Sequence, residues 1–482
     1  MPIKTAEQYI QSLRKLKLRA YVLGEKIENF VDHPMVRPSI NALAMTYELA
    51  NDPKYEGVMT ATSHLTGKKI NRFTHIHQNV EDLIKKVKVL RLLGQKTGAC
   101  FQRCVGWDAI NALSSVTYEM DQKLGTNYNE KFNKYLRYFQ ENDLTGVGSM
   151  TDVKGDRHLR PSQQADPDLY LHVIKENKDG IVVRGSKAHQ TGALGSHEII
   201  VMPTLAMKEE DKSYAVSFAI PNDAEGILHI CGRQPSDTRK LEGGEIDVGN
   251  VRYGVAGFET LIIFEDVFVP WERVFMCGEY EFTGTLVERF TGYHRQCYGG
   301  CRVGVGDVLI GAAATIAEYN GVEGAPHIRD KITEMIHLNE TLYSSGIACS
   351  AQGSRTPSGT YIVDLMQANV CKQNVTRFIH EICRLAQDIA GGLVVTMPSE
   401  KDLRHPEVGK YVDKYLRAKV DVPTEHRMRI LRLIENMTLG SLLVEVMHGA
   451  GSPQAQRINI FRQAEIEKKK KLAKTLAGIE KG

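Results

Sequence analysis

The period of the hydrophobic pattern changes twice along this 482-residue chain, and these changes constrain the fold more than any other feature. Up to about residue 145, apolar residues recur at helical spacing, as at Tyr9, Leu13, Leu16 and Ala20, which would share one helical face. From there to about residue 280, short apolar runs alternate with polar loops that contain glycine. Helical spacing then returns and continues to the end. The order predicts a helical segment, an antiparallel β module and a helical bundle.

The β module and the bundle can be divided into predicted elements. Residues 169–174 and 181–183 flank an Asp-Gly turn and predict a hairpin. Further strands are predicted at residues 198–202, 214–220 and 260–264. Long helices typical of a bundle are predicted at residues 283–318, 326–352, 361–391, 424–447 and 459–477. We therefore expect an α+β fold with domains at residues 1–145, 146–280 and 281–482.

Composition excludes several classes of partner. Apolar residues make up 42% and charged residues 25% of the chain, the balance of a soluble globular protein. The formal net charge is only +3, so no basic surplus predicts binding to nucleic acid or to a membrane surface. The first residues lack the apolar core of a secretory signal, and no uncharged apolar run approaches the roughly 18 residues that span a bilayer. We expect a cytoplasmic protein.

Nine cysteines in so long a chain argue against a disulfide scaffold. Cys100 and Cys104 have C-x-x-x-C spacing, which would place both thiols on one face if the segment is helical. Residues 290–301 gather His294, Cys297 and Cys301 with three glycines, which let backbone approach a bulky inorganic group. Cys100 and Cys104, completed by His294 and Cys301, could hold an iron–sulfur cluster with three thiolates and one imidazole. From spacing alone, inert buried thiols and a hydrogen-bonded histidine remain slightly favoured.

Polar loops of the β module could bind a cofactor. The segments 150–157 and 187–192 are dense in donors and charges, which can bind the edge of a flavin ring or a pyrophosphate. For any single residue an ordinary polar loop is the stronger alternative. The candidates are Thr151, Asp156, Arg157, His189, Gln190 and Thr191.

Two acidic residues have apolar neighbours in the sequence. Glu259 precedes the predicted strand at residues 260–264, and Glu445 lies in an apolar stretch at residues 442–447. Apolar surroundings raise the pKa of a carboxyl group, which suits proton transfer near neutral pH. The alternative is a partly exposed acid at the end of an element, and it is strong for Glu259.

Seven separated phrases carry a resemblance that covers nearly the whole chain. They are GEKIEN at 24–29, VDHP at 31–34, RPSIN at 37–41, ACFQRC at 99–104, GYHRQ at 292–296, LNETLY at 338–343 and MHGAGSPQ at 447–454. Through them the chain resembles the 4-hydroxybutyryl-CoA dehydratase family, whose fold is that of the acyl-CoA dehydrogenase-like flavoproteins. The related flavin-dependent 4-hydroxyphenylacetate 3-monooxygenases share the fold but lack the cluster ligands.

The resemblance implies FAD and a [4Fe-4S] cluster. It implies that Cys100, Cys104, His294 and Cys301 bind the cluster and that Cys297 is not a ligand. The imidazole would leave one iron more labile and Lewis-acidic than its thiolate-bound neighbours. His294 would also be placed to take the C2 proton of the substrate.

The resemblance also assigns residues around the flavin. Glu259 and Glu445 would be active-site acids, and Tyr298 would lie near the substrate. The middle domain would be barrel-like and contact the flavin through Thr191, with His189 and Gln190 beside it. A neighbouring subunit would supply Gly391 and Gly392, although the spacing from Gln387 is one residue longer than in acyl-CoA dehydrogenases.

The function implied is that of a hydro-lyase. It is radical dehydration of 4-hydroxybutyryl-CoA to crotonyl-CoA, with vinylacetyl-CoA isomerase activity as a side reaction, in a homotetramer. Acid–base catalysis alone supplies about 10²–10⁴-fold, too little for the unactivated C3–H bond, so transient one-electron oxidation is required. The alternative is a flavin monooxygenase of phenols in which the cysteines are only buried thiols.

Overall fold

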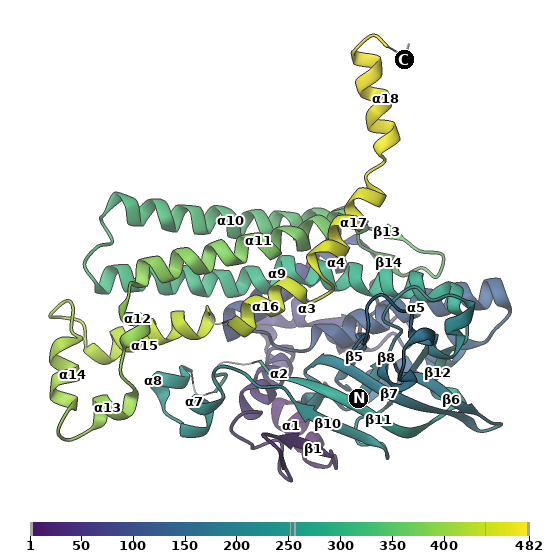
Figure 1. The fold of residues 1–482 in the computed structure, drawn as a ribbon, viewed down its shortest axis with the longest axis horizontal. Coiled ribbons are helices and arrows are strands. Elements are labelled where there is room, and N and C mark those ends of the chain that lie inside the picture. Colours follow the sequence, from purple (N-terminus) through teal and green to yellow (C-terminus); the bar gives the residue numbers. More distant parts are fainter. Residues whose placement is uncertain (1–2, 251, 255–256, 439, 480–482) are drawn as a thin grey trace.

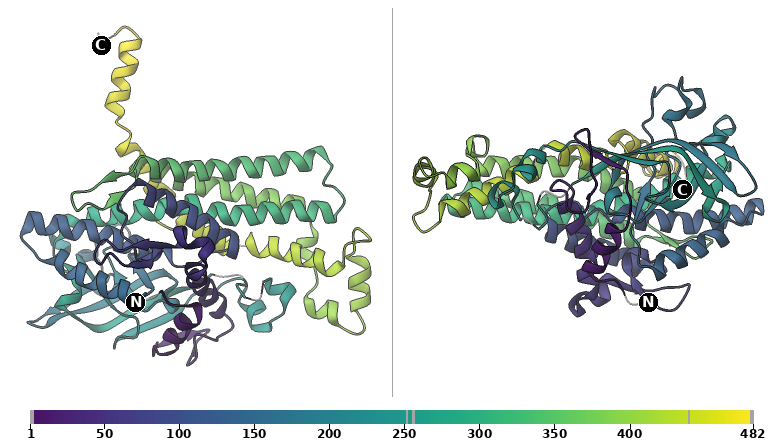
Figure 2. Two further views of the ribbon diagram at one scale, coloured as in Figure 1. Left: turned by 180° about the vertical axis from the view of Figure 1, so that it is seen from behind. Right: turned by 90° about the horizontal axis from the view of Figure 1, so that it is seen from below.

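The computed structural model describes residues 3–250, 252–254, 257–438 and 440–479. A layer of long helices lies over a twisted β module, and the last helix, α18, projects away from both (Figure 1). From behind and from below, one end of the helical bundle extends beyond the β module (Figure 2).

The N-terminal segment is mainly helical but also contributes strands. The Thr5 side chain caps α1 by accepting a hydrogen bond from the Gln8 backbone N–H. The predicted helical face through Ala20 is wrong, because α1 ends at Arg14 and Ala20 pairs with His229 in the sheet. The elements are α1 (Ala6–Arg14), β1 (Ala20–Val22), β2 (Glu25–Lys26), α2 (Arg37–Asn51), α3 (Glu56–Met59), β3 (Thr60–Thr62), β4 (Lys69–Asn71), α4 (Val80–Thr97), α5 (Cys104–Leu124) and α6 (Tyr128–Glu141).

Two sheets make up the β module. Their strand orders are β2-β1-β10-β11-β7-β6 and β12-β9-β8-β5. The predicted hairpin is confirmed as the antiparallel pair β6 and β7. The module is not purely antiparallel, because β1 runs parallel to β10 and β5 parallel to β8, and the pattern within one strand does not reveal such crossovers. The elements are β5 (Gly146–Ser149), β6 (His172–Glu176), β7 (Gly180–Thr191), β8 (Glu198–Val201), β9 (Val216–Pro221), β10 (Ile227–Cys231), α7 (Asp237–Glu242), α8 (Glu245–Val248), β11 (Glu259–Pro270) and β12 (Val274–Cys277).

Three long helices form the bundle, and their predicted ranges are confirmed to within a few residues. The predictions of one helix at residues 424–447 and one at residues 459–477 are wrong. The first range holds α15 and most of α16, and the second holds the end of α17 and all of α18. The elements are α9 (Thr283–Tyr319), α10 (Pro326–Ala351), β13 (Ser354–Arg355), β14 (Tyr361–Ile362), α11 (Leu365–Ala390), α12 (Leu393–Thr396), α13 (Glu400–Arg404), α14 (Gly409–Tyr415), α15 (Thr424–Met437), α16 (Gly440–His448), α17 (Pro453–Gln463) and α18 (Ile466–Leu476).

The central helix of the molecule is α9. It packs against α4 and α5 on one side and against α10 and α11 on the other. Among the described residues, the helical stretch Tyr280–Tyr319 is long and apolar enough to cross a membrane, but 67% of its most apolar window is buried inside the protein. Burial of that kind is typical of a core helix.

Two hydrophobic cores meet along α9. One core joins the N-terminal helices to the β module and includes Cys297 and Cys301. The other fills the bundle and includes Tyr298 and Val303. Residues 290–301 of α9, which include His294, Cys297 and Cys301, therefore lie where the helical segment, the β module and the bundle meet.

Candidate active site

The first cysteine pair does not lie on one helix. Cys100 is in the loop that follows Gly98, and α5 begins only at Cys104. Gly98 ends α4 with a φ of +60°, and Gln102 turns the loop with a φ of +64°. The helical arrangement expected for C-x-x-x-C is therefore wrong, although the loop still directs both cysteines to one region.

Close packing of α9 on α4 positions the second cysteine segment. A Cβ added at Gly300 would lie 2.5 Å from the carbonyl oxygen of Val87, and one at Gly304 would lie 2.1 Å from that of Arg91. Only glycine permits this approach of the two backbones. His294, Cys297 and Cys301 follow each other at i, i+3 and i+7 on the same side of α9.

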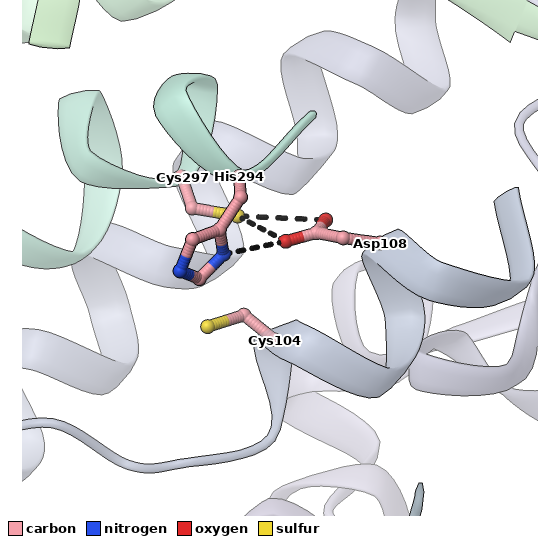
Figure 3. Close-up of side chains that lie close together, drawn as sticks. All are labelled: Cys104, Asp108, His294 and Cys297. Atoms are coloured by element: carbon pink, nitrogen blue, oxygen red, sulfur yellow. Dashed lines mark hydrogen bonds and ion pairs between the residues drawn. The ribbon is translucent and has the colours of Figure 1, made fainter. Parts of the chain in front are cut away.

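Four buried side chains form a compact group (Figure 3). One donor atom from each of Cys104, Asp108, His294 and Cys297 lies within 4.8 Å of the others. His294 Nδ1 is 2.8 Å from Asp108 Oδ2, and the Cys297 thiol donates to the same oxygen at 3.3 Å. Burial alone would lower the pKa of His294, but the hydrogen bonds and negative charges of Asp108 and Cys297 together outweigh it and raise the pKa to about 9.

The three predicted cluster cysteines are close enough to affect one another. Burial, and then the charge of Glu445, raise the pKa of Cys100, to which Cys301 also contributes. A hydrogen bond with Cys297 and burial raise the pKa of Cys104, and Cys100 adds to this effect. Burial raises the pKa of Cys301 to about 12. Burial thus disfavours the thiolate form of these cysteines. A bound cation would have the opposite effect, because it stabilises thiolates.

Two carboxyl groups face one cavity beside the cysteine loop. The cavity has a volume of about 80 Å³ and is lined by Glu259, Glu445 and Ala99, among others. Burial and the charge of Glu445 raise the pKa of Glu259 to about 8, and Thr191 Oγ1 donates to its carboxyl at 2.5 Å. Glu445 pairs with the buried guanidinium of Arg302. The two acids thus differ, because Glu259 favours the protonated form and Glu445 has a cationic partner, Arg302.

Tyr298 lies between the histidine and two cations, Arg302 and Lys372. Its ring centroid is 5.5 Å from that of His294 and 4.4 Å from Nζ of Lys372. Lys372 is fully buried and donates to the carbonyl oxygens of Val446 and Met447 in α16. The end of α16 presses on the ring, because a Cβ at Gly449 would lie 1.8 Å from the Tyr298 hydroxyl.

Part of the predicted flavin set lies together at one end of β7. The backbone N–H of Ala188 donates to the carbonyl oxygen of Thr151 at 2.8 Å, which holds the first loop beside the strand. The register between β7 and β11 shifts at this point, and His189 has a φ of +58°. A bulge with a left-handed non-glycine residue often marks a functional site. Gln190 and Thr191 complete this strand end beside Glu259.

The other predicted flavin residues are exposed within one chain. Asp156 and Arg157 are exposed in the loop that follows Thr151. Gly391 and Gly392 are exposed at the end of α11. The helix that follows them, α12, lies at the end of the bundle away from the β module (Figures 1 and 2).

Sequence reasoning missed three charged residues of the site. Lys86, Asp108 and Lys372 are completely buried, with 0% exposure. Each has apolar residues one turn before and one turn after it on its helix, and a charge between them is the signal that could have identified it. Their partners lie on other helices and cannot be found from spacing.

Comparisons with known proteins show the family of the chain. The N-terminal model of the 4-hydroxyphenylacetate 3-hydroxylase family matches residues 5–276, and the C-terminal model matches residues 283–478. A Clostridium aminobutyricum protein named 4-hydroxybutyryl-CoA dehydratase/vinylacetyl-CoA-Delta-isomerase is 61% identical over 491 residues, which cover 99% of this chain and 100% of that protein.

Solved structures extend the comparison. An oxygen-tolerant archaeal 4-hydroxybutyryl-CoA dehydratase from N. maritimus has a TM-score of 0.97 and 56% identity, with 100% of this chain and 96% of the other covered. The oxygenase component of 4-hydroxyphenylacetate 3-monooxygenase complexed with FAD has a TM-score of 0.87 at 24% identity, covering 98% of each chain, and shares the fold. A glutaryl-coenzyme A dehydrogenase, at a TM-score of 0.53 and 12% identity over 100% of this chain and 98% of that one, shares the general architecture. This chain therefore belongs to the 4-hydroxybutyryl-CoA dehydratase/vinylacetyl-CoA isomerase family within the 4-hydroxyphenylacetate 3-hydroxylase-like proteins.

Proposed function

We propose that this protein dehydrates 4-hydroxybutyryl-CoA to crotonyl-CoA, isomerises vinylacetyl-CoA as a second activity, and uses FAD and a [4Fe-4S] cluster. The observation that supports the proposal is a buried group that contains Cys104 and His294, close to a cavity with two carboxyl groups, where the charges of Cys301 and Glu445 also act on Cys100. The relative at 61% identity bears the name of this activity.

The residues fit an iron–sulfur cluster. Thiolates and imidazole are the protein ligands of such clusters. Buried polar atoms around the cysteines also lack partners among the residues that the structure describes, namely Nε and Nη1 of Arg302 and both amide atoms of Gln102. Buried donors need acceptors, and sulfur atoms of a cluster would provide them. We propose Cys100, Cys104, His294 and Cys301 as the ligands.

The bulged end of β7 fits a flavin. Exposed His189 and partly exposed Thr191 stand beside Thr151 at the junction of the β module and the bundle. A Cβ at Gly192 would lie 2.5 Å from the carbonyl oxygen of Gln102, so this strand end and the cysteine loop touch. A flavin here would lie next to the cluster ligands. A substrate bound between the flavin and these ligands could then exchange an electron with the flavin.

When bound, the two cofactors would supply one-electron oxidation and its return, and a Lewis-acidic iron for the hydroxyl group at C4. Four protons move in this dehydration: C2 and C3 each lose one, and the leaving hydroxyl group and C4 each gain one. We assign two of these transfers to residues of the chain. The protonated carboxyl of Glu259 would donate to the departing hydroxyl group, which then leaves as water rather than hydroxide. His294 would take the proton from C2 through Nε2 when that nitrogen is released from iron, because Nδ1 is held by Asp108. Glu445, which lines the cavity and is held by Arg302, would orient the acyl chain, and Tyr298 would lie near the substrate.

The oligomer remains a prediction, and we propose a homotetramer. Gly391 and Gly392 are exposed at an end of the bundle that one chain does not bring to its own β module. A neighbouring subunit could receive them beside its flavin. We retain the cytoplasmic location as a prediction from the sequence.

Anaerobic purification tests the function. We expect brown protein with about four irons and one FAD per chain, and crotonyl-CoA as the product from 4-hydroxybutyryl-CoA. Iron-free yellow protein that hydroxylates phenols with reduced FAD would contradict the proposal and support the monooxygenase alternative.

The pKa of Glu259 predicts the pH dependence of the reaction. A carboxyl with a pKa of about 8 is protonated at pH 7, so kcat should fall about tenfold for each unit above pH 8. Glu259→Gln should lower kcat by about 10²–10⁴-fold and remove this alkaline decline from the residual activity. Glu265→Gln, on the exposed side of the same strand, is the matched control and should keep the wild-type profile. An alkaline decline that persists in Glu259→Gln would rule out this assignment.

A further inference from the structure

We propose that Asp108 positions His294 for iron by holding its Nδ1–H, and that Lys86 fixes the Asp108 carboxylate in this role. The inference rests on the proposed function, because it takes His294 as a ligand of the proposed cluster. It concerns two residues that do not line the cavity and are not themselves proposed as ligands.

The geometry of the histidine supports this role. The side chain of Asp108 is completely buried and its Oδ2 lies 2.8 Å from His294 Nδ1. The other ring nitrogen points away from the carboxylate (Figure 3). Histidine ligands almost always donate the N–H of the second nitrogen to a carboxylate, carbonyl or water, which fixes the ring and leaves the other nitrogen unprotonated for the metal. Asp108 stands where such a partner is required.

Lys86 holds the carboxylate from the opposite side. Its ammonium group donates to Asp108 Oδ1 and, at 3.2 Å, to the carbonyl oxygen of Tyr293. It also lies 5.4 Å from the ring centroid of Trp107 and 5.2 Å from that of Tyr293. One carboxylate oxygen thus serves the lysine and the other the histidine. The chain Lys86–Asp108–His294 ties α4, α5 and α9 together behind the proposed cluster.

Substitution by asparagine separates positioning from simple structural support. An amide has one acceptor atom, and beside the Lys86 ammonium its oxygen will turn toward the lysine. The NH₂ group then faces His294 Nδ1 and favours the tautomer with its proton on Nε2. That tautomer cannot bind iron through Nε2.

The test is pulsed electron paramagnetic resonance on the anaerobically reduced protein, read for coupling of the cluster to a histidine nitrogen. We expect Asp108→Asn to lose this coupling and to release iron to a chelator about 10–100-fold faster than wild type, with FAD content unchanged. The double variant Lys86→Met/Asp108→Asn should recover the coupling, because the amide oxygen is then free to accept from Nδ1–H. The matched control is Glu198→Gln, which breaks a buried pair with Arg273 in the β module.

The outcomes are distinguishable. Nitrogen coupling and iron release in Asp108→Asn that match wild type would overturn the inference while the proposed function stands. A double variant without recovery would overturn the role of Lys86. If Asp108→Asn does not fold, Lys86→Met/Asp108→Leu takes its place, because it leaves no buried charge without a partner and no acceptor facing Nδ1–H. Wild-type coupling and iron release in that variant would overturn the inference. Wild-type protein without iron would contradict the proposed function and the inference together.

Discussion

Replacement of Cys104 by serine is expected to remove the cluster and reduce crotonyl-CoA formation more than about 100-fold, since loss of even a supporting partner of a metal ligand has effects of 10–100-fold. Cys104 is buried at the start of α5 and is the proposed ligand that also belongs to the compact group with His294. Cys301→Ser should have the same effect. The measurements are iron content, visible absorbance and activity of anaerobically purified protein.

Cys297 provides the informative contrast. It lies in the compact group and donates to Asp108, but the family resemblance excludes it as a ligand. Cys297→Ser should therefore keep its iron, because a hydroxyl can donate to Asp108 in place of the thiol. Cys349→Ser, in a buried position where the thiol donates to the carbonyl oxygen of Gly346, measures the effect of the exchange alone. Loss of iron in Cys297→Ser with retention in Cys301→Ser would show that the ligand set is wrong.

The order of elements could be predicted because hydrophobic period depends on local geometry. The long helices of the bundle and the hairpin β6–β7 follow from spacing and turn chemistry alone. The early end of α1 could not be found in this way, since Ala20 continues the helical spacing. Its backbone pairs instead with His229, which is remote in the sequence. Tertiary pairing overrides local pattern in such cases.

The residues of the site could be predicted from the sequence only by their chemical types. Cysteines, a histidine and acids with apolar neighbours identified candidates, and the family resemblance joined them. The spacing of Cys100 and Cys104 suggested a helix, whereas Gly98 was the signal for a helix end that favours the observed loop. Lys86 and Asp108 had no visible relation to His294, because they meet only when α4, α5 and α9 pack together.

The second large effect is expected at Gly304, where α9 crosses α4. Alanine is the better helix former by roughly 1 kcal/mol, so propensity alone predicts that Gly304→Ala stabilises the protein. The added Cβ would lie 2.1 Å from the carbonyl oxygen of Arg91 and 2.9 Å from Cα of Gly94, and neither backbone atom can move aside as a side chain would. Overpacking of this kind costs about 1–3 kcal/mol and outweighs the propensity. The clash should also separate the helices near Cys301, whose carbonyl oxygen lies against Gly94.

Gly311→Ala is the matched control on the same helix, because no atom lies within 4 Å of the added Cβ. It should raise the midpoint of thermal unfolding slightly, whereas Gly304→Ala should lower it and reduce the iron content. Both variants change the unfolded chain in the same way, so their difference isolates the contact between α9 and α4. If Gly304→Ala and Gly311→Ala had equal midpoints and equal iron contents, the two helices could separate without disturbing Cys301. The close glycine contact would then not be what positions the cysteines on α9.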